Sequence, residues 1–507
     1  MADLGVCFPA SGDAPVSTTA IAKDIFGRVA IAAKDDDLAT RLRAEANWRQ
    51  NYPQHLVALT QRLLQTPEAA LAGAKTGLDA VYEMFEFTDL QGRRKLTEEM
   101  AFAETRAGDL VTETITGTGT LPEGPKLTVP VGSSVLAGEV LASEVDALVG
   151  FGAAEPSVAT SIKHIVGLGG AELQALLSRF AFVLLGATSE MGPARTLLSM
   201  GATVVAVARP GAKLDSLVEQ AKTSPGRLLV PRAMGKDAFG VDVLQQPAAI
   251  AGWLATLEPE RRLVLDNLIY LNAADHVRAT VAMDAIALSV RKLRGGDVSG
   301  VALAYLGSYS TAHPITKEAW EAQRHNYDDR PWWTRPILTL KPNQLPLVAA
   351  KDALGADVAI PIFDGFSVMQ GPNYALAKTL QMWRGVVDRA QGVTISANMA
   401  PSCRTSSVMQ SSTIASALKG MTNFHPLAVY DAPTASALMA GLLLYDLDSP
   451  DSVANPAVPL SNPLELYCQN SFHGGGWRCG FKFETIGVAS VTLGTVGIGR
   501  RSPFTTQ

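Results

Sequence analysis

Cysteine, aromatic residues and long apolar runs are all scarce in this sequence. Four cysteines in 507 residues exclude a disulfide scaffold, and 7% aromatic residues leave much of the packing to alanine, valine and leucine. The strongest apolar run, at 437–445, is shorter than the roughly 18 residues that a membrane-spanning helix needs. The segment at 1–15 has no secretory signal pattern. We therefore expect a cytoplasmic protein without a membrane span, and cleaved organelle targeting stays open.

Charge of one sign is also not in excess. Lys and Arg number 43 against 48 Asp and Glu, a net charge of -5, so we expect no nucleic-acid partner. What the chain does have is apolar material: 47% of residues are hydrophobic and 18% charged, which predicts folded cores. At roughly 150 residues per domain, the length favours about three domains. We divide the chain into 1–175, 176–450 with an insert at 311–357, and 451–507.

The first part, 1–175, has the composition of an α+β region of unknown role. Apolar residues recur at helical spacing between 38 and 90, whereas 108–148 is rich in Thr, Val and Gly and predicts short strands and loops. It contains no catalytic constellation. We interpret it as a cap or an assembly surface.

Strands and helices alternate from residue 180 to 308. Five uniformly apolar segments predict buried strands of a parallel sheet, and helical segments separate them. Repeated units of this kind favour an α/β fold with a doubly wound parallel Rossmann sheet. The predicted strands are 180–186, 203–208, 226–231, 261–271 and 300–308, and the predicted helices are 193–201, 213–224, 246–257 and 274–293.

A glycine loop connects the first of these strands to its helix. Gly186 permits a tight turn at the strand end, and Gly192 lets backbone N–H groups approach a pyrophosphate at the start of the helix. Thr188, Ser189 and Met191 are the other candidate cofactor contacts in the loop. The alternative is a glycine-rich turn that binds nothing.

The second strand is followed by Arg209, close to where the adenosine ribose of a dinucleotide would lie. An acidic residue there would bind the 2′-hydroxyl of NAD, whereas an arginine suits the 2′-phosphate of NADP. The residue therefore favours NADP(H) over NAD(H). The alternative is an arginine that is merely exposed at a strand end.

The segment LLGATSEMGPARTLLSMGATVVAVAR (184–209) resembles the opening βαβ unit of the short-chain dehydrogenase/reductase family. The middle glycine of the family's loop is replaced here by Glu190. The resemblance also implies that Asp242 and Val243, after the third strand, contact the adenine.

A second motif is Tyr374-Ala-Leu-Ala-Lys378. The spacing places both side chains on one helix face, and a lysine ammonium near a phenol lowers the tyrosine pKa, so that the tyrosine can exchange a proton with a carbonyl or alcohol oxygen. The lysine can also hold the nicotinamide ribose. The next predicted strand, 393–401, leads to Thr405 and Ser406, either of which the family resemblance implies as a contact to the nicotinamide carboxamide or diphosphate.

The serine that accompanies the tyrosine in the family has two candidates. Ser308 ends the fifth strand, which requires 311–357 to loop out as an insert, whereas Ser367 lies close before Tyr374 in sequence. We leave both open. The family's helix asparagine is also missing, and Thr280 and Asp284 occupy that helix instead.

The insert and the tail carry the remaining unusual residues. Trp332 and Trp333, among arginines, indicate either a substrate lid or an oligomer contact with a local core. We expect the tail at 451–507 to be β-rich. It contains Cys468, His473 and Cys479, but their spacing matches no standard zinc pattern, and we expect no metal.

Two functions follow from these patterns. The first is an NADP-dependent oxidoreductase that interconverts a small-molecule carbonyl and alcohol, such as a ketoacyl-like substrate, and works as a homo-oligomer. The second is a protein of the same fold that serves as a structural or assembly subunit with a weak or absent reaction.

Overall fold

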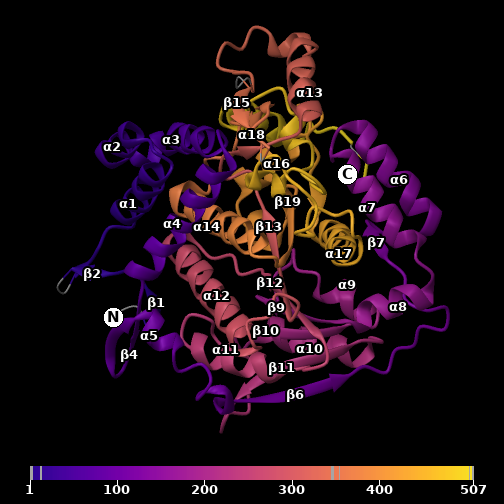
Figure 1. The fold of residues 1–507 in the computed structure, drawn as a ribbon. Helices are drawn as coiled ribbons and strands as arrows, with labels where there is room; N and C mark the ends of the chain where they lie inside the picture. The colour runs from indigo at the N-terminus through magenta and orange to yellow at the C-terminus, as the bar shows by residue number, and fades with distance from the viewer. Residues whose placement is uncertain (1–3, 12–13, 344–346, 353, 502, 505–507) are drawn as a thin grey trace.

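The computed structural model describes residues 4–11, 14–343, 347–352, 354–501 and 503–504. A seven-stranded sheet with the strand order β18-β13-β12-β9-β10-β11-β6 forms its centre (Figure 1). Six strands pair in parallel, and β6 runs antiparallel to β11 at the edge. The predicted α/β class and a mostly parallel sheet are confirmed. The strands are β6 (Leu110–Thr116), β9 (Phe180–Leu185), β10 (Thr203–Val207), β11 (Arg227–Ala233), β12 (Arg262–Asn267), β13 (Val301–Gly307) and β18 (Thr394–Met399).

The side chains of the parallel strands alternate between two apolar clusters, one on each face of the sheet. In β9, Val183 belongs to the first cluster and Phe182 to the second. Because both faces are covered, each strand is a continuous apolar run. Helices α11 (Pro247–Thr256), α12 (Ala273–Leu293) and α14 (Gly371–Ala390) contribute to the first cluster, and α8 (Gly170–Ser178), α9 (Ala194–Ser199), α10 (Ala212–Thr223) and α17 (Ala432–Asp448) to the second.

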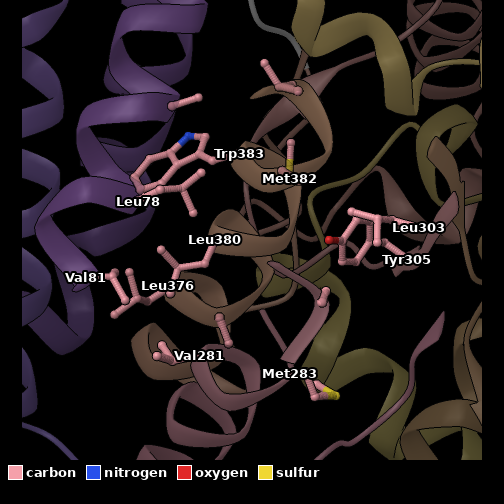
Figure 2. Packing of buried hydrophobic residues seen from close by; sticks show 14 of the residues in the cluster. Leu78, Val81, Val281, Met283, Leu303, Tyr305, Leu376, Leu380, Met382 and Trp383 are labelled. Carbon is pink, nitrogen blue, oxygen red and sulfur yellow. The ribbon is translucent and has the colours of Figure 1, made fainter. Parts of the chain in front are cut away.

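The N-terminal helices extend the first cluster outward. Gly77 of α4 lies so close to Trp383 of α14 that an added Cβ would come within 2.2 Å of the indole ring. Leu78 and Val81 of α4 also face α14 (Figure 2). The helices expected between 38 and 90 are present, and one apolar cluster joins this region to the central sheet. The expected helices are α2 (Asp36–Ala44), α3 (Trp48–Leu63) and α4 (Pro67–Met84), and a further helix, α1 (Thr18–Ala32), precedes them.

The strands and loops expected at 108–148 are only partly right. Strand β6 and a hairpin of β7 and β8 are present, but a helix, α6, begins at Gly138. Its Leu141, Val145 and Leu148 form one buried stripe at helical spacing, and this burial favours a helix. The other elements of 1–175 are β1 (Gly5–Cys7), β2 (Ala10–Ser11), β3 (Ala14–Pro15), β4 (Glu86–Asp89), β5 (Gly92–Lys95), α5 (Leu96–Met100), a 3₁₀ turn at Ala107–Asp109, β7 (Thr128–Val131), β8 (Ser134–Ala137), α6 (Gly138–Phe151) and α7 (Pro156–Gly167).

The insert leaves the sheet after β13 and returns just before α14. It forms one helix and short strand pairs, and α13 projects at the top of the molecule (Figure 1). Because the insert lies outside the central sheet, the end of β13 stays next to α14. The elements between β13 and α14 are β14 (His313–Pro314), α13 (Lys317–Asp328), a 3₁₀ turn at Trp332–Thr334, β15 (Val348–Lys351), β16 (Asp357–Ile360) and β17 (Ile362–Phe363), of which β16 and β17 extend past the expected end of the insert at 357.

The prediction of a β-rich tail at 451–507 is wrong. The described residues of the tail form two 3₁₀ turns and a helix, α18, and no strand. Although its valines and threonines favour strands, Gly494 of α18 packs against the backbone of Ser416 on α16, so tertiary contact overrides the local preference. The elements after β18 are β19 (Cys403–Arg404), α15 (Ser406–Met409), α16 (Ser412–Met421), β20 (Tyr430–Asp431), 3₁₀ turns at Pro463–Tyr467 and Gly476–Arg478, and α18 (Phe483–Thr495).

Candidate active site

Tyr374 and Lys378 lie in the first two turns of α14, as their spacing predicts. The Lys378 side chain reaches back to the end of β13, where its ammonium donates hydrogen bonds to the Leu306 carbonyl at 2.7 Å and to Gln381 Oε1 at 3.1 Å. Lys378 is only 2% exposed. The lysine is therefore fixed to the sheet edge from inside the protein.

Burial controls the pKa values of this pair. It lowers the pKa of Lys378 to about 7, against the opposing charge of Asp266. Burial also raises the pKa of Tyr374 to about 12, and hydrogen bonding with Ser308 and Gln370 offsets only part of that rise. The sequence led us to expect a lowered tyrosine pKa, and in this structure the direction is the opposite because desolvation of the phenolate dominates. Tyr374 is therefore a protonated phenol at neutral pH.

Of the two candidate serines, Ser308 is the one beside Tyr374. It follows β13 directly, its hydroxyl acts against the rise in the pKa of Tyr374, and it donates to Ser310 Oγ at 3.1 Å. Ser310 in turn donates to the side chain of Gln370, the residue that precedes α14. Ser367 contributes a backbone N–H to the Tyr309 carbonyl at 2.7 Å. The insert thus brings a distant serine, rather than the nearest one in sequence, to the tyrosine.

Two aromatic residues that sequence reasoning missed complete this site. The ring of His276, in the first turn of α12, stacks on Tyr374 at 4.5 Å between centroids and on Tyr270 at 5.7 Å. The Lys378 ammonium lies 4.5 Å from the Tyr270 ring centroid and 5.8 Å from that of Tyr374. Burial lowers the pKa of His276 to about 3, so the imidazole is neutral. The sequence feature that could have indicated Tyr270 is its position in the short connection between a buried strand and the following helix.

The glycine loop occupies the neighbouring part of the same sheet edge. Gly186 has a φ of +103°, and a Cβ there would come within 2.8 Å of the Leu268 backbone and the Ile269 side chain, so the turn requires glycine. Gly192 donates its N–H to the Ser189 carbonyl at 3.0 Å and leaves little room beside Leu268. Thr188, Ser189 and Met191 are partly exposed along this loop.

Glu190 connects the glycine loop to the segment after β18. Its carboxylate accepts a hydrogen bond from the Ser406 backbone N–H at 2.7 Å and lies 3.6 Å from the Lys213 ammonium. Burial raises the pKa of Glu190, but the Ser406 hydrogen bonds and the Lys213 charge outweigh it and lower that pKa. Thr405, at the start of α15, hydrogen-bonds with Ser407 at 3.2 Å. A negative charge therefore sits within the predicted diphosphate region.

The remaining predicted cofactor residues lie farther along the sheet, after β10 and β11. Arg209 is exposed, and the segment that carries it runs beside the one that leads to Asp242, since the Val241 N–H donates to the Ala208 carbonyl at 2.8 Å. Asp242 Oδ1 accepts the Leu244 N–H at 2.8 Å, and Val243 is buried in the first cluster. The structure groups these residues with each other and not with Tyr374.

Thr280 and Asp284 lie on the helix where the family has an asparagine. Asp284 forms two hydrogen bonds with Arg384, at 2.7 and 2.9 Å, and accepts the Tyr82 hydroxyl at 2.7 Å. Thr280 is buried, and its hydroxyl has no hydrogen-bond partner among the described residues. Asp284 is thus held in an ion-pair network between α4, α12 and α14.

The aromatic residues of the insert divide into two kinds. Trp332 is 80% exposed, whereas Trp333 packs against Phe424 at 5.5 Å in a small apolar cluster that also contains Phe481. Trp333 thus belongs to a local core, one of the alternatives considered from the sequence, and Trp332 faces solvent. In the tail, His473 hydrogen-bonds Glu155 at 2.9 Å and Cys468 donates to the Pro314 carbonyl at 3.3 Å.

Comparison of the chain with protein-family models, curated proteins and solved structures finds no match. Among the residues that the structure describes, no three or more His, Cys, Asp or Glu side chains gather as metal ligands. Within the same residues, every helix is too short or too polar to cross a membrane.

Proposed function

We propose that this protein is an NADP(H)-dependent oxidoreductase that interconverts a carbonyl and an alcohol on a doubly wound Rossmann sheet of the short-chain dehydrogenase/reductase type. The observation that carries the proposal is the meeting of Ser308, Tyr374 and Lys378 at the end of β13. The strand order supports the fold assignment, because β10 and β12 flank β9, and in sheets of this order a dinucleotide binds outside the carboxyl end of the strand at which the order reverses.

The residues at this edge fit most of a dinucleotide. Gly186, Gly192 and the hydroxyls of Thr188 and Ser189 would line the diphosphate, with Thr405 opposite. Met191 would contact the same part of the cofactor. NADPH supplies a hydride to the carbonyl carbon, or NADP takes one from the alcohol.

The adenosine half would lie farther along the same edge. Arg209 would bind the 2′-phosphate, and Asp242 and Val243 would border the adenine. The exposure of Arg209 supports this role, because the side chain is open to a ligand phosphate.

Three side chains at the end of β13 would have separate roles in the reaction. Tyr374 donates its proton to the substrate oxygen. A phenol with a pKa of about 12 is protonated at neutral pH and so can act as the acid. Ser308 hydrogen-bonds the same oxygen and orients it. The Lys378 ammonium, 5.8 Å from the ring of Tyr374, stabilises the phenolate that remains. This arrangement favours carbonyl reduction, with ketoacyl-like compounds as the first substrates to try.

The test begins with binding. NADPH is titrated against the pure protein by fluorescence, and turnover is measured on a panel of carbonyl compounds that includes a ketoacyl thioester. Tyr374→Phe should retain binding and lose turnover by at least about a hundredfold, whereas Tyr327→Phe, in the distant insert, should retain both. Absence of dinucleotide binding would overturn the proposal.

A second function, as a structural or assembly subunit, is favoured by Glu190, whose charge opposes a diphosphate. The structural function would be supported if the protein binds a dinucleotide but shows no turnover on the carbonyl panel, and if Tyr374→Phe changes neither result. Either function is compatible with a cytoplasmic homo-oligomer without a nucleic-acid partner. Exposed apolar residues in the middle of α18 and just after it, Val488, Val496 and Ile498, are a candidate contact surface.

A further inference from the structure

The buried ammonium of Lys378 has at most one N–H group left for a ligand, and an aromatic ring lies close to it. An ammonium carries three N–H groups. Two donate to the Leu306 carbonyl and to Gln381 Oε1, and the ring of Tyr270 covers the nitrogen at 4.5 Å. With the side chain 2% exposed, a ribose hydroxyl cannot reach this nitrogen without displacing these partners.

Tyr270 lies against Lys378 and directly follows the residues that border the glycine loop. It lies in the connection from β12 to α12, directly after Leu268 and Ile269, the two residues that border Gly186 of the glycine loop. On its other side it packs near His276, which stacks on Tyr374. The residue thus lies between the predicted diphosphate loop and the predicted acid, where the nicotinamide ribose of a bound cofactor would be.

The Tyr270 phenol is also available to a ligand. The residue is partly exposed, unlike Lys378, and no hydrogen bond of its hydroxyl is found among the residues that the structure describes. A hydroxyl on a ring held by a cation and a stacked imidazole is positioned with little conformational freedom.

We propose that Tyr270 supplies the hydroxyl that hydrogen-bonds the nicotinamide ribose, and that Lys378 holds the Tyr270 ring rather than the ribose. The inference rests on the proposed function and assigns a cofactor-binding residue within it. It requires no change in the roles of Tyr374 and Ser308, because neither contacts the ribose in this arrangement.

Two ligands separate this role from a structural one. NADPH contains the nicotinamide ribose, whereas adenosine 2′,5′-bisphosphate contains only the adenosine half. Tyr270→Phe keeps the ring over Lys378 and removes only the hydroxyl. We expect this variant to bind NADPH about tenfold more weakly, the effect of one hydrogen bond, and adenosine 2′,5′-bisphosphate as the unchanged protein does. Calorimetric titration measures both affinities, and thermal unfolding checks that the variant is folded.

Three results would overturn the inference. Unchanged NADPH affinity in Tyr270→Phe would show that the hydroxyl does not contact the cofactor. Equal weakening for both ligands would indicate a structural effect. Tighter NADPH binding in Tyr270→Ala would show that the ring blocks the crevice. If the unchanged protein binds neither ligand, the proposed function itself fails and the assignment of Tyr270 fails with it.

Discussion

The Glu190 carboxylate accepts a hydrogen bond from the Ser406 backbone N–H at 2.7 Å and so joins two loops that are far apart in sequence. One loop follows β9 and the other follows β18, on either side of the place where a cofactor diphosphate would lie. A diphosphate entering there meets a like charge, which the Lys213 ammonium at 3.6 Å offsets only in part.

Glu190→Gln should therefore tighten NADPH binding, by about fivefold at low salt, because the amide removes the charge and leaves an acceptor for Ser406. Fluorescence titration at two salt concentrations measures the effect, which should shrink as salt rises. Glu219→Gln, an exposed charge on α10, is the control. Weaker binding in Glu190→Gln would mean that the carboxylate supports the site.

Arg209→Asp should reverse the preference between the two dinucleotides. A carboxylate repels the 2′-phosphate of NADPH and accepts the 2′-hydroxyl of NADH, so the affinity ratio should shift towards NADH by at least about tenfold. Arg195→Asp makes the same charge change on α9 and should leave the ratio unaltered. An unaltered ratio in Arg209→Asp itself would remove this residue from the site.

Gly186→Ala should destabilise the protein more than the same substitution at a glycine where the new Cβ causes backbone strain but no collision. Gly295 also has a positive φ, +88°, but a Cβ there would meet nothing within 4 Å. We expect Gly295→Ala to cost about 1 kcal/mol and Gly186→Ala at least twice as much, because its Cβ also collides with the Leu268 backbone. Urea unfolding measures both, and equal losses would contradict the steric argument.

Arg384→Met should be among the most damaging substitutions outside the site. Arg384 is 7% exposed and pairs with Asp284 and Asp388, so its loss leaves the partly buried Asp284 without its cation and leaves Asp388 with Arg291 alone. Breaking a buried pair in this way costs about 3–5 kcal/mol of unfolding free energy. Lys317→Met, in an exposed pair with Glu321, should change stability little. A loss below about 1 kcal/mol for Arg384→Met would show that the network is hydrated.

Glu155 should make stability depend on pH below 4.5. Burial raises its pKa, but hydrogen bonds and charges from His473 and Arg478 outweigh burial and lower the pKa to about 2. A carboxylate with a depressed folded-state pKa stabilises the protein above its unfolded pKa, and this stability is lost as pH falls towards 2. Chemical unfolding followed from pH 5 to 2 should show that the unchanged protein loses about 3 kcal/mol of unfolding free energy and that Glu155→Gln loses less. The same pH dependence in Glu155→Gln and in the unchanged protein would contradict the role given to the Glu155 carboxylate.

The core of the sheet could be predicted because its strands are uniformly apolar and regularly spaced. Short strands were expected around β6, but its place at the edge of this sheet could not be predicted, since it pairs with β11, more than a hundred residues later. The tail was predicted wrongly for a related reason. The β-branched residues of α18 favour a strand, but close contact between Gly420 and Ser490 across α16 and α18 requires two helices.

The candidate site was predictable where it depends on spacing along one helix. Tyr374 and Lys378 are of this kind. The choice between Ser308 and Ser367 was not, because it depends on how the insert leaves and rejoins the sheet edge. Tyr270 and His276 were missed because stacked rings arise from the meeting of a loop with two helices, and no spacing rule encodes that contact.

The packing of Gly77 against Trp383 has a consequence for how copies of this chain associate. Helix α14 carries an apolar face that needs a partner, and the partner is a helix of the same polypeptide. Because the two are tethered, their effective concentration does not fall when the protein is diluted. This face therefore stays covered in a lone molecule, and any assembly of several copies must be built from a different surface.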